Sequence, residues 1–218
     1  MSAPEAITPS EFRNLLTTPD FCGQMDDILF YSDKTHHNAG FAVYRAAGGL
    51  VLSEAIHEHS QLDLTLGDDG LARPDLMVTV HTHTPNLNGD QGSGVLSPKD
   101  LRQHVILDSV RPGLVSIVAK QFGQDFSDEA FTTLHMARRN PSAEAAVITD
   151  QLEAIDELPD VIRSLIHWDQ VMQENGLVSV RGRYTAPHLR VNQSAETPPP
   201  KYQPSAAQLA RQLFWGTQ

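Results

Sequence analysis

The sequence predicts an α/β or α+β domain followed by a helix-rich extension. In the first half of the chain, short apolar runs are separated by glycine-containing turns, which is typical of strands. The second half holds longer stretches in which apolar residues recur at helical spacing. Residues 192–204 contain four prolines, which indicates an extended linker. We therefore expect a main domain over residues 1–125, a helix-rich extension over 126–191, and the linker with a short terminal helix over 192–218.

The main domain is expected to begin with a short helix at residues 10–17, capped by Ser10. Gly48-Gly49 predicts a hairpin turn between two of the strands that follow. Ser97, with Pro98 behind it, predicts the start of a helix that runs to about residue 106. The strands are expected at residues 27–32, 39–46, 50–56, 61–66, 76–80 and 113–119.

Helices dominate the expectation for the second half of the chain. One is expected at residues 127–138, and a longer helical stretch at 141–175 is expected to break at Pro159. A strand is expected at 176–184. The terminal helix at 206–215 carries an apolar group that could dock on the parent domain or on a protein partner, and the sequence leaves both open. That group consists of Leu209, Leu213, Phe214 and Trp215.

Composition excludes several classes of function. Sixteen basic residues face 27 acidic ones, the formal charge is −11, and no basic run is present, so nucleic acid is not an expected partner. No stretch reaches the roughly 18 apolar residues that cross a bilayer, and the first residues do not resemble a signal peptide. We expect a cytoplasmic protein without a membrane partner. The single cysteine, Cys22, fits that compartment and is expected to be a buried, inert thiol.

One group of residues points to metal chemistry. His81 and His83 end the strand expected at 76–80, and residues two apart on a strand point to the same side. Asp100 follows at the third position of the next helix, where a carboxylate is favoured. Two histidines, a carboxylate and a water form the open tetrahedral site of catalytic zinc. Such a zinc ion lowers the pKa of its water to about 7 and polarises a carbonyl.

Other histidines are weaker candidates. His57 and His59 form a second pair with the same spacing, and such pairs arise by chance in a chain with ten histidines. Only the pair at His81 lies between a buried-type strand and a glycine-rich loop that leads to a capped helix. His36 is expected in a turn. His104, four residues after Asp100, is expected at the surface or behind the ligands.

Together these segments resemble the JAMM metalloproteases, also called JAB or MPN+ domains. That family carries a Glu on an early strand, then His-Ser/Thr-His, then Ser-x-x-Asp. The resemblance covers roughly residues 21–124 and implies a mixed β-sheet flanked by helices, with the layering of cytidine deaminases. The matching residues are Glu54, His81-Thr82-His83 and Ser97-Pro98-Lys99-Asp100.

The resemblance also implies a role for each residue. His81, His83 and Asp100 would bind one zinc ion. Glu54 would be the general base, although Glu58 has the same strand parity and remains an alternative. The Ser97 hydroxyl would stabilise the oxyanion. The substrate would be a peptide or isopeptide amide, with a ubiquitin-like or peptide tag as one candidate for the group removed.

Two other functions remain open on sequence grounds. The run Val78 to Thr84 also resembles the entry motif of barrel-type phosphoesterases and amidohydrolases, which bind two or three metal ions. A non-enzymatic MPN-like scaffold is the third possibility, although such domains usually lack the metal ligands that this chain retains. The loop at residues 84–94 is expected to form a flap beside the metal that gates access to it.

Overall fold

In the computed structural model, a mixed six-stranded sheet forms the centre of the described part of the chain. Its order is β2-β1-β3-β4-β5-β6; β3 and β4 are parallel, and every other neighbouring pair is antiparallel. The strands are β1 (Gly40–Ala46), β2 (Gly49–Leu52), β3 (Leu76–Thr82), β4 (Val115–Phe122), β5 (Phe131–Arg139) and β6 (Leu177–Tyr184). The structure describes residues 5–57, 73–83, 96–122, 131–140, 142–158, 172–174, 176–184 and 206–215.

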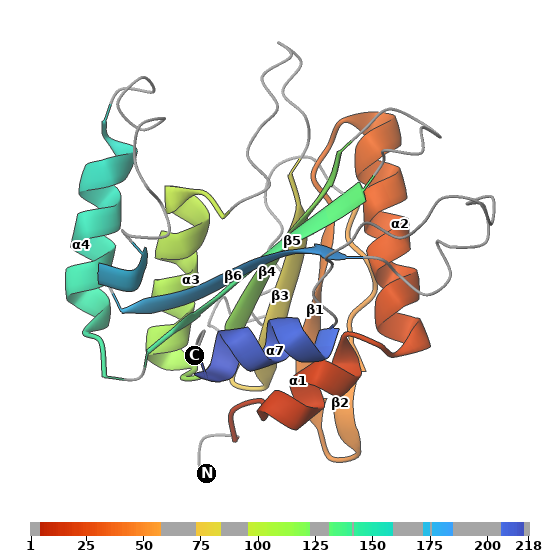
Figure 1. Cartoon of the computed structure of the whole chain (residues 1–218), viewed down its shortest axis with the longest axis horizontal. Helices are drawn as coiled ribbons and strands as arrows, with labels where there is room; N and C mark the ends of the chain where they lie inside the picture. The colour runs from red at the N-terminus through yellow and green to blue at the C-terminus, as the bar shows by residue number, and fades with distance from the viewer. Residues whose placement is uncertain are drawn as a thin grey trace.

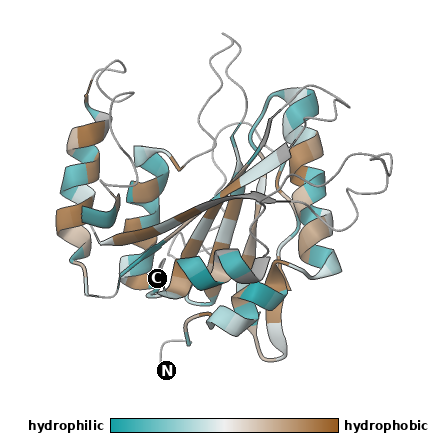
Figure 2. Ribbon diagram, in the orientation of Figure 1, coloured by the Kyte–Doolittle hydropathy of each residue, from teal (hydrophilic) through white to brown (hydrophobic). Residues whose placement is uncertain are grey.

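Helices cover both faces of this sheet (Figure 1). Helices α1, α2 and α7 pack on one face, and α3 and α4 pack side by side on the other. Hydrophobic and hydrophilic residues alternate along these helices, as expected for helices with one buried face (Figure 2). The expectation of an α/β protein with a helix-flanked mixed sheet is therefore confirmed. The helices are α1 (Pro9–Leu15), α2 (Pro19–Thr35), α3 (Pro98–Val110), α4 (Ala145–Asp156) and α7 (Ala206–Trp215).

The strand expected at residues 27–32 is wrong, because these residues belong to α2. A short apolar run does not distinguish a strand from a buried helix. The buried residues of α2 recur at helical spacing toward the sheet, whereas Phe30, inside the run, is 64% exposed. Thr18 caps the helix by accepting a hydrogen bond from the Phe21 N–H, and Pro19 occupies its first turn. Thr18 followed by Pro19 was therefore the sequence signal that could have predicted this helix.

The helix expected at residues 127–138 is also wrong where the structure describes it, because residues 131–139 form β5. β5 lies between β4 and β6 and is buried on both faces. Leu134 and Met136 belong to one core, whereas Ala137 packs into the other. A strand covered on both sides lacks the polar alternation that marks a strand in sequence. The sheet consequently continues past residue 125 into the segment expected to be mostly helical.

Smaller differences concern caps and turns. Thr8, not Ser10, caps α1, in a capping box with Glu11. The hairpin between β1 and β2 is confirmed, but Ala46 pairs with Gly49, so its two loop residues are Ala47 and Gly48. The strand expected at residues 50–56 ends at Leu52.

Most remaining elements match their expected positions. The predicted strands at 39–46, 76–80, 113–119 and 176–184 correspond to β1, β3, β4 and β6, and the helix predicted behind Ser97 is α3. Cys22 is buried, as expected. None of the described helices is long and apolar enough to cross a membrane. The expectations at residues 61–66 and 84–94, at Pro159 and for the linker lie outside the described residues.

The terminal helix α7 has the predicted bounds and packs on its own chain, beside α1 and the strands β5 and β6. The Arg138 guanidinium donates to the carbonyl oxygens of Leu213 (2.7 Å) and Phe214 (3.0 Å). Leu213 is fully buried, whereas Trp215 is 63% exposed. Leu213, with Phe214 packed against the same cluster, therefore belongs to the core of the parent domain. A protein partner at α7 stays a prediction.

Candidate metal centre

His81 and His83 lie at the carboxyl end of β3, one of the two central strands. His81 pairs with Gly40 on β1 and with Val118 on β4, so the backbone is fixed from both sides. One residue past the strand, the His83 N–H donates to the Ala119 carbonyl at 3.3 Å. The side chain of Thr82, between the two histidines, is buried and accepts a hydrogen bond from the Ala39 N–H at 2.9 Å. Strand alternation therefore places both imidazoles on the α3 side of the sheet.

Asp100 reaches the same place from the first turn of α3. The Ser97 hydroxyl accepts a hydrogen bond from the Asp100 N–H (3.2 Å), and the Asp100 carboxylate accepts one from the Ser97 N–H (2.7 Å). This reciprocal capping box satisfies two backbone donors that the helix leaves open. It also fixes the orientation of the carboxylate, because one of its oxygens is held by the cap.

The three side chains meet at distances that suit a metal ion. The Nε2 atoms of His81 and His83 are 3.2 Å apart, and they lie 3.4 and 3.1 Å from the two carboxylate oxygens of Asp100. Two ligands bound to zinc at about 2.0–2.1 Å with tetrahedral angles are about 3.3 Å apart. The donor set of two imidazoles and one carboxylate suits the same ion. The structure thus brings His81, His83 and Asp100 into a group that could hold a metal.

The electrostatics and exposure of the group favour the same reading. Burial alone would raise the pKa of Asp100, but hydrogen bonds and charge interactions with His81 and His83 hold that pKa far below its usual range. Asp100 is therefore a carboxylate at neutral pH, as a ligand must be. The three side chains are 19–22% exposed, so solvent or a ligand can reach the centre.

Ser97 and Glu54, the two residues expected to act beside the metal, are placed differently. Ser97 lies at the site through its contacts with Asp100. Glu54 is exposed and follows β2, so it does not lie within a strand as expected. No hydrogen bond or ion pair joins Glu54 to the three ligand residues in the described part of the chain. Glu58, the alternative, lies outside the described residues.

The segment that carries Glu54 lies across β1 from the histidines. Ile56, two residues on, forms a bridge with Gly40, which pairs with His81 on its other side. Neighbouring strands are about 4.8 Å apart, so the segment of Glu54 lies roughly 10 Å from β3, across β1. On the α3 face, β1 presents only Gly40 and Ala42 near this line. On this face β1 therefore places no bulky side chain between Glu54 and the histidines.

His104 proves to be fully buried and does not approach the centre as a ligand. Its Nδ1 lies 2.9 Å from the Ser116 hydroxyl, which is itself 2.9 Å from the Thr79 hydroxyl. Burial lowers the pKa of His104 to about 4, so the ring is neutral. These three residues form a buried polar cluster between α3 and the sheet, behind the ligands. The expectation of a surface position is therefore wrong, and a supporting role for His104 behind the ligands stays a prediction.

The second histidine pair does not form a metal group with any described residue. His57 lies 2.9 Å from the Asp27 carboxylate and stacks on Tyr31 with ring centroids 4.5 Å apart. His59 lies outside the described residues. His36 ends α2 in the left-handed conformation (φ 55°), which agrees with the expected turn.

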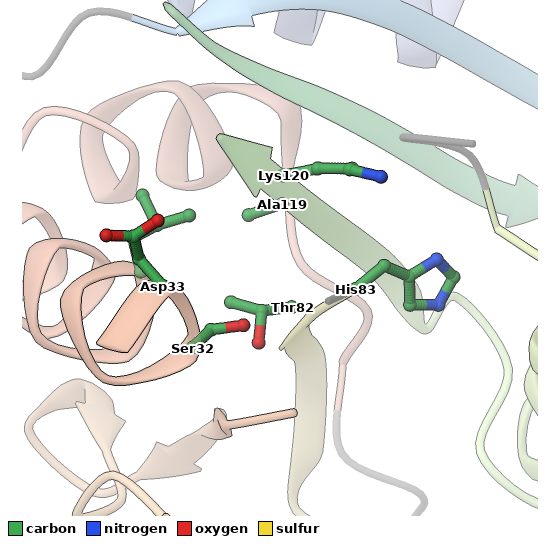
Figure 3. A pocket seen from close by; sticks show the side chains of 7 residues that line it. Ser32, Asp33, Thr82, His83, Ala119 and Lys120 are labelled. Carbon is green, nitrogen blue, oxygen red and sulfur yellow. The ribbon is translucent and has the colours of Figure 1, made fainter. Parts of the chain in front are cut away.

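Two buried polar residues near the centre were missed in the sequence. His135 on β5 accepts a hydrogen bond from the Leu96 N–H at 2.8 Å, directly before the Ser97 cap. Lys120 on β4 is only 2% exposed, and burial lowers the pKa of its ammonium. It lines a pocket beside His83 together with Ser32, Asp33 and Thr82 (Figure 3). The signal was a lysine directly after the mostly apolar run Val115–Ala119, which is hard to interpret before the strand order is known.

Comparisons with known proteins add no independent identification. The sequence matches no protein-family model, and no curated protein is significantly similar to it. The interpretation of the site therefore depends on its residues and their geometry.

Proposed function

We propose that the protein is a zinc-dependent hydrolase that cleaves a peptide or isopeptide amide bond, in the manner of the JAMM metalloproteases. The observation that carries the proposal is the convergence of the three side chains at a partly exposed position: the two Nε2 atoms are 3.2 Å apart, and each lies 3.1–3.4 Å from one carboxylate oxygen of Asp100. Histidine with carboxylate, at an open site, is a donor set of catalytic rather than structural zinc. The pattern Glu54, His81-Thr82-His83 and Ser97–Asp100 supports the reaction class.

In this proposal each residue has a separate task. His81, His83 and Asp100 would hold the zinc ion, which would polarise the substrate carbonyl and lower the pKa of a water molecule. Glu54 accepts the proton of the attacking water and returns it to the leaving amine, as a general acid–base group does. The Ser97 hydroxyl donates to the negative charge that develops on the carbonyl oxygen. A ubiquitin-like or peptide tag on an amine fits this chemistry as substrate.

A single ligand group favours this function over the phosphoesterase and amidohydrolase alternative. Enzymes of those types use several carboxylate and histidine ligands around two or three ions. Within the described residues, one His-His-Asp group meets the geometry for a metal. The scaffold alternative is less favoured, because a protein without metal chemistry has no need to keep three ligands in register.

Metal content combined with activity tests the proposal. Protein purified without chelator should contain about one zinc ion per chain and should cleave members of a peptide and isopeptide library, detected by mass spectrometry. Glu54→Gln should keep the metal and the fold but lower the rate at least about a hundredfold. Glu58→Gln is the matched control and should have little effect.

The outcomes separate the alternatives. Two or three ions per chain would favour the phosphoesterase or amidohydrolase type. If Glu58→Gln abolishes activity and Glu54→Gln does not, Glu58 is the general base. If the metal binds and neither variant loses activity, the proposed mechanism is wrong.

A further inference from the structure

The two oxygens of the Asp100 carboxylate have different surroundings. Oδ2 accepts a hydrogen bond from the Ser97 N–H at 2.7 Å and lies 3.1 Å from His83 Nε2. Oδ1 lies 3.4 Å from His81 Nε2 and takes no part in that hydrogen bond. The carboxylate turns about a single bond, so the contact of Oδ2 with the cap decides where Oδ1 points. The position of the Ser97 amide therefore controls how Asp100 faces the two histidines.

The position of the Ser97 amide depends in turn on Leu96, the residue directly before it. The Leu96 side chain is 1% exposed and packs with Val118 in the core between the sheet and α3. Its N–H donates to His135 Nδ1 at 2.8 Å. Consecutive amides of the segment that enters α3 are thus held by two side chains, the first by His135 and the second by Asp100.

The sheet holds His135 in line with a metal ligand. Val118 on β4 pairs with His81 on β3 and with His135 on β5. Side chains of directly paired residues lie on the same face of a sheet. His135 is therefore on the α3 face, two strands or about 10 Å from His81. Its side chain is fully buried, and β5 is paired on both sides. The anchor of the α3 entrance and the ligand His81 consequently share one frame of paired strands.

Accepting the Leu96 N–H also restricts the protonation of the His135 ring. A nitrogen that accepts a hydrogen bond carries no hydrogen, so the neutral ring has its hydrogen on Nε2. An imidazolium carries a hydrogen on both nitrogens and cannot accept at Nδ1. The contact with Leu96 therefore needs the neutral ring in one of its two tautomers.

We propose that His135 is a positioning residue of the metal centre, which holds the Leu96 amide and, through the Ser97 cap, directs the Asp100 carboxylate toward His81 and His83. This inference rests on the proposed function and specifies how its ligand group is held ready for the ion. Contacts that orient a metal ligand typically contribute about 10–100-fold to metal affinity. His135 acts two residues before the α3 helix begins, so it places the cap rather than touching the ligands.

Zinc affinity of the full chain, measured by competition with a chelator, tests the inference. His135→Leu removes the acceptor, and we expect zinc to bind at least about tenfold more weakly, because Asp100 is no longer held in place. His135→Asn puts an amide oxygen near the position of Nδ1 and should restore affinity close to that of the wild type. His104→Leu is the matched control, because it removes another fully buried ring on the same face, one that bonds to Ser116. Its zinc affinity should be unchanged.

Nitrogen NMR of the imidazole gives a second measurement, which needs no variant. In the wild type, His135 Nδ1 should show the chemical shift of a nitrogen without hydrogen that accepts a hydrogen bond. If His135→Leu does not fold, His135→Phe replaces it, since it keeps a ring without the acceptor and should show the same loss of affinity.

Four results would overturn the positioning role while leaving the metal site intact. They are wild-type zinc affinity in His135→Leu, an equal loss in His104→Leu, no gain of affinity in His135→Asn over His135→Leu, and a hydrogen on Nδ1 of the wild type. A wild-type protein that binds no zinc would instead overturn the proposed function, and the positioning role with it.

Discussion

Two histidine clusters lie on the α3 face of the sheet. Each contains one residue of α3, Asp100 in the first and His104 in the second, and these two are four residues apart. The clusters differ in exposure and in the partners of their histidines. At the metal centre, His81 and His83 meet the Asp100 carboxylate with their side chains about one-fifth exposed. In the buried polar cluster, His104 meets the hydroxyl of Ser116 and is 1% exposed. The first cluster offers converging donor atoms to solvent, whereas the second uses its ring to join a helix to a strand.

The difference teaches that burial and partner, not residue type, separate a ligand from a structural histidine. A carboxylate partner completes a donor set and supplies the negative charge that a cation needs. A hydroxyl partner in a dry environment only satisfies a hydrogen bond and leaves the imidazole neutral. Asp100 and His104 are one helical turn apart on α3, so adjacent turns of one helix carry a metal-ligand candidate and a buried structural residue.

The largest expected effect is loss of the metal. Replacing both ligands in a His81→Ala/His83→Ala variant removes two of three donors, and we expect zinc content to fall from about one ion per chain to below about a tenth of that. His104→Ala should keep near-stoichiometric zinc. Elemental analysis of both proteins makes the measurement. Full zinc in the double variant, or none in His104→Ala with its fold retained, would break the distinction between the clusters.

The next effect is on stability in acid. The unfolded chain protonates His104 near pH 6.5, whereas burial lowers its pKa to about 4 in the folded protein. The contribution of neutral His104 to the free energy of unfolding is therefore complete above pH 6.5. It is lost as the pH falls toward 4, because the unfolded chain binds the proton more strongly than the folded protein does. The difference corresponds to about 3 kcal/mol of unfolding free energy. Urea unfolding of the metal-free protein from pH 7 to pH 4 measures it, and His104→Gln should flatten that part of the profile.

A smaller effect is expected at the helix cap. Ser97→Ala removes the hydroxyl that holds the Asp100 N–H and should reduce stability by about 1 kcal/mol. It should also weaken zinc binding by roughly 10–100-fold, because the orientation of a ligand depends on its supporting contacts. Thr8→Ala is the matched control, since Thr8 forms the same capping box with Glu11 on α1. A similar loss of stability with unchanged zinc affinity is expected there; equal zinc affinity in both variants would show that the cap does not position Asp100.

The sequence by itself determined the features that depend on neighbours along the chain. His81 and His83 lie on one side of β3 because alternation places residues two apart on the same face. Asp100 stands at the third position of α3 because Ser97 and Pro98 start a helix in a recognisable way. Their meeting follows from a strand that leads into a helix packed on the same sheet. The ligand group was therefore accessible to local patterns.

Only the tertiary structure decided the features that depend on distant neighbours. The run at residues 27–32 became helix because α2 packs along the sheet, and residues 131–139 became a strand because β4 and β6 pair with them. Glu54 proved to be exposed because β2 ends at Leu52, and Lys120 stands level with His83 because β3 and β4 run parallel. Strand pairing joins residues far apart in the sequence, and its energy comes from packing on both faces rather than from local preference. A short window of sequence therefore does not predict these features.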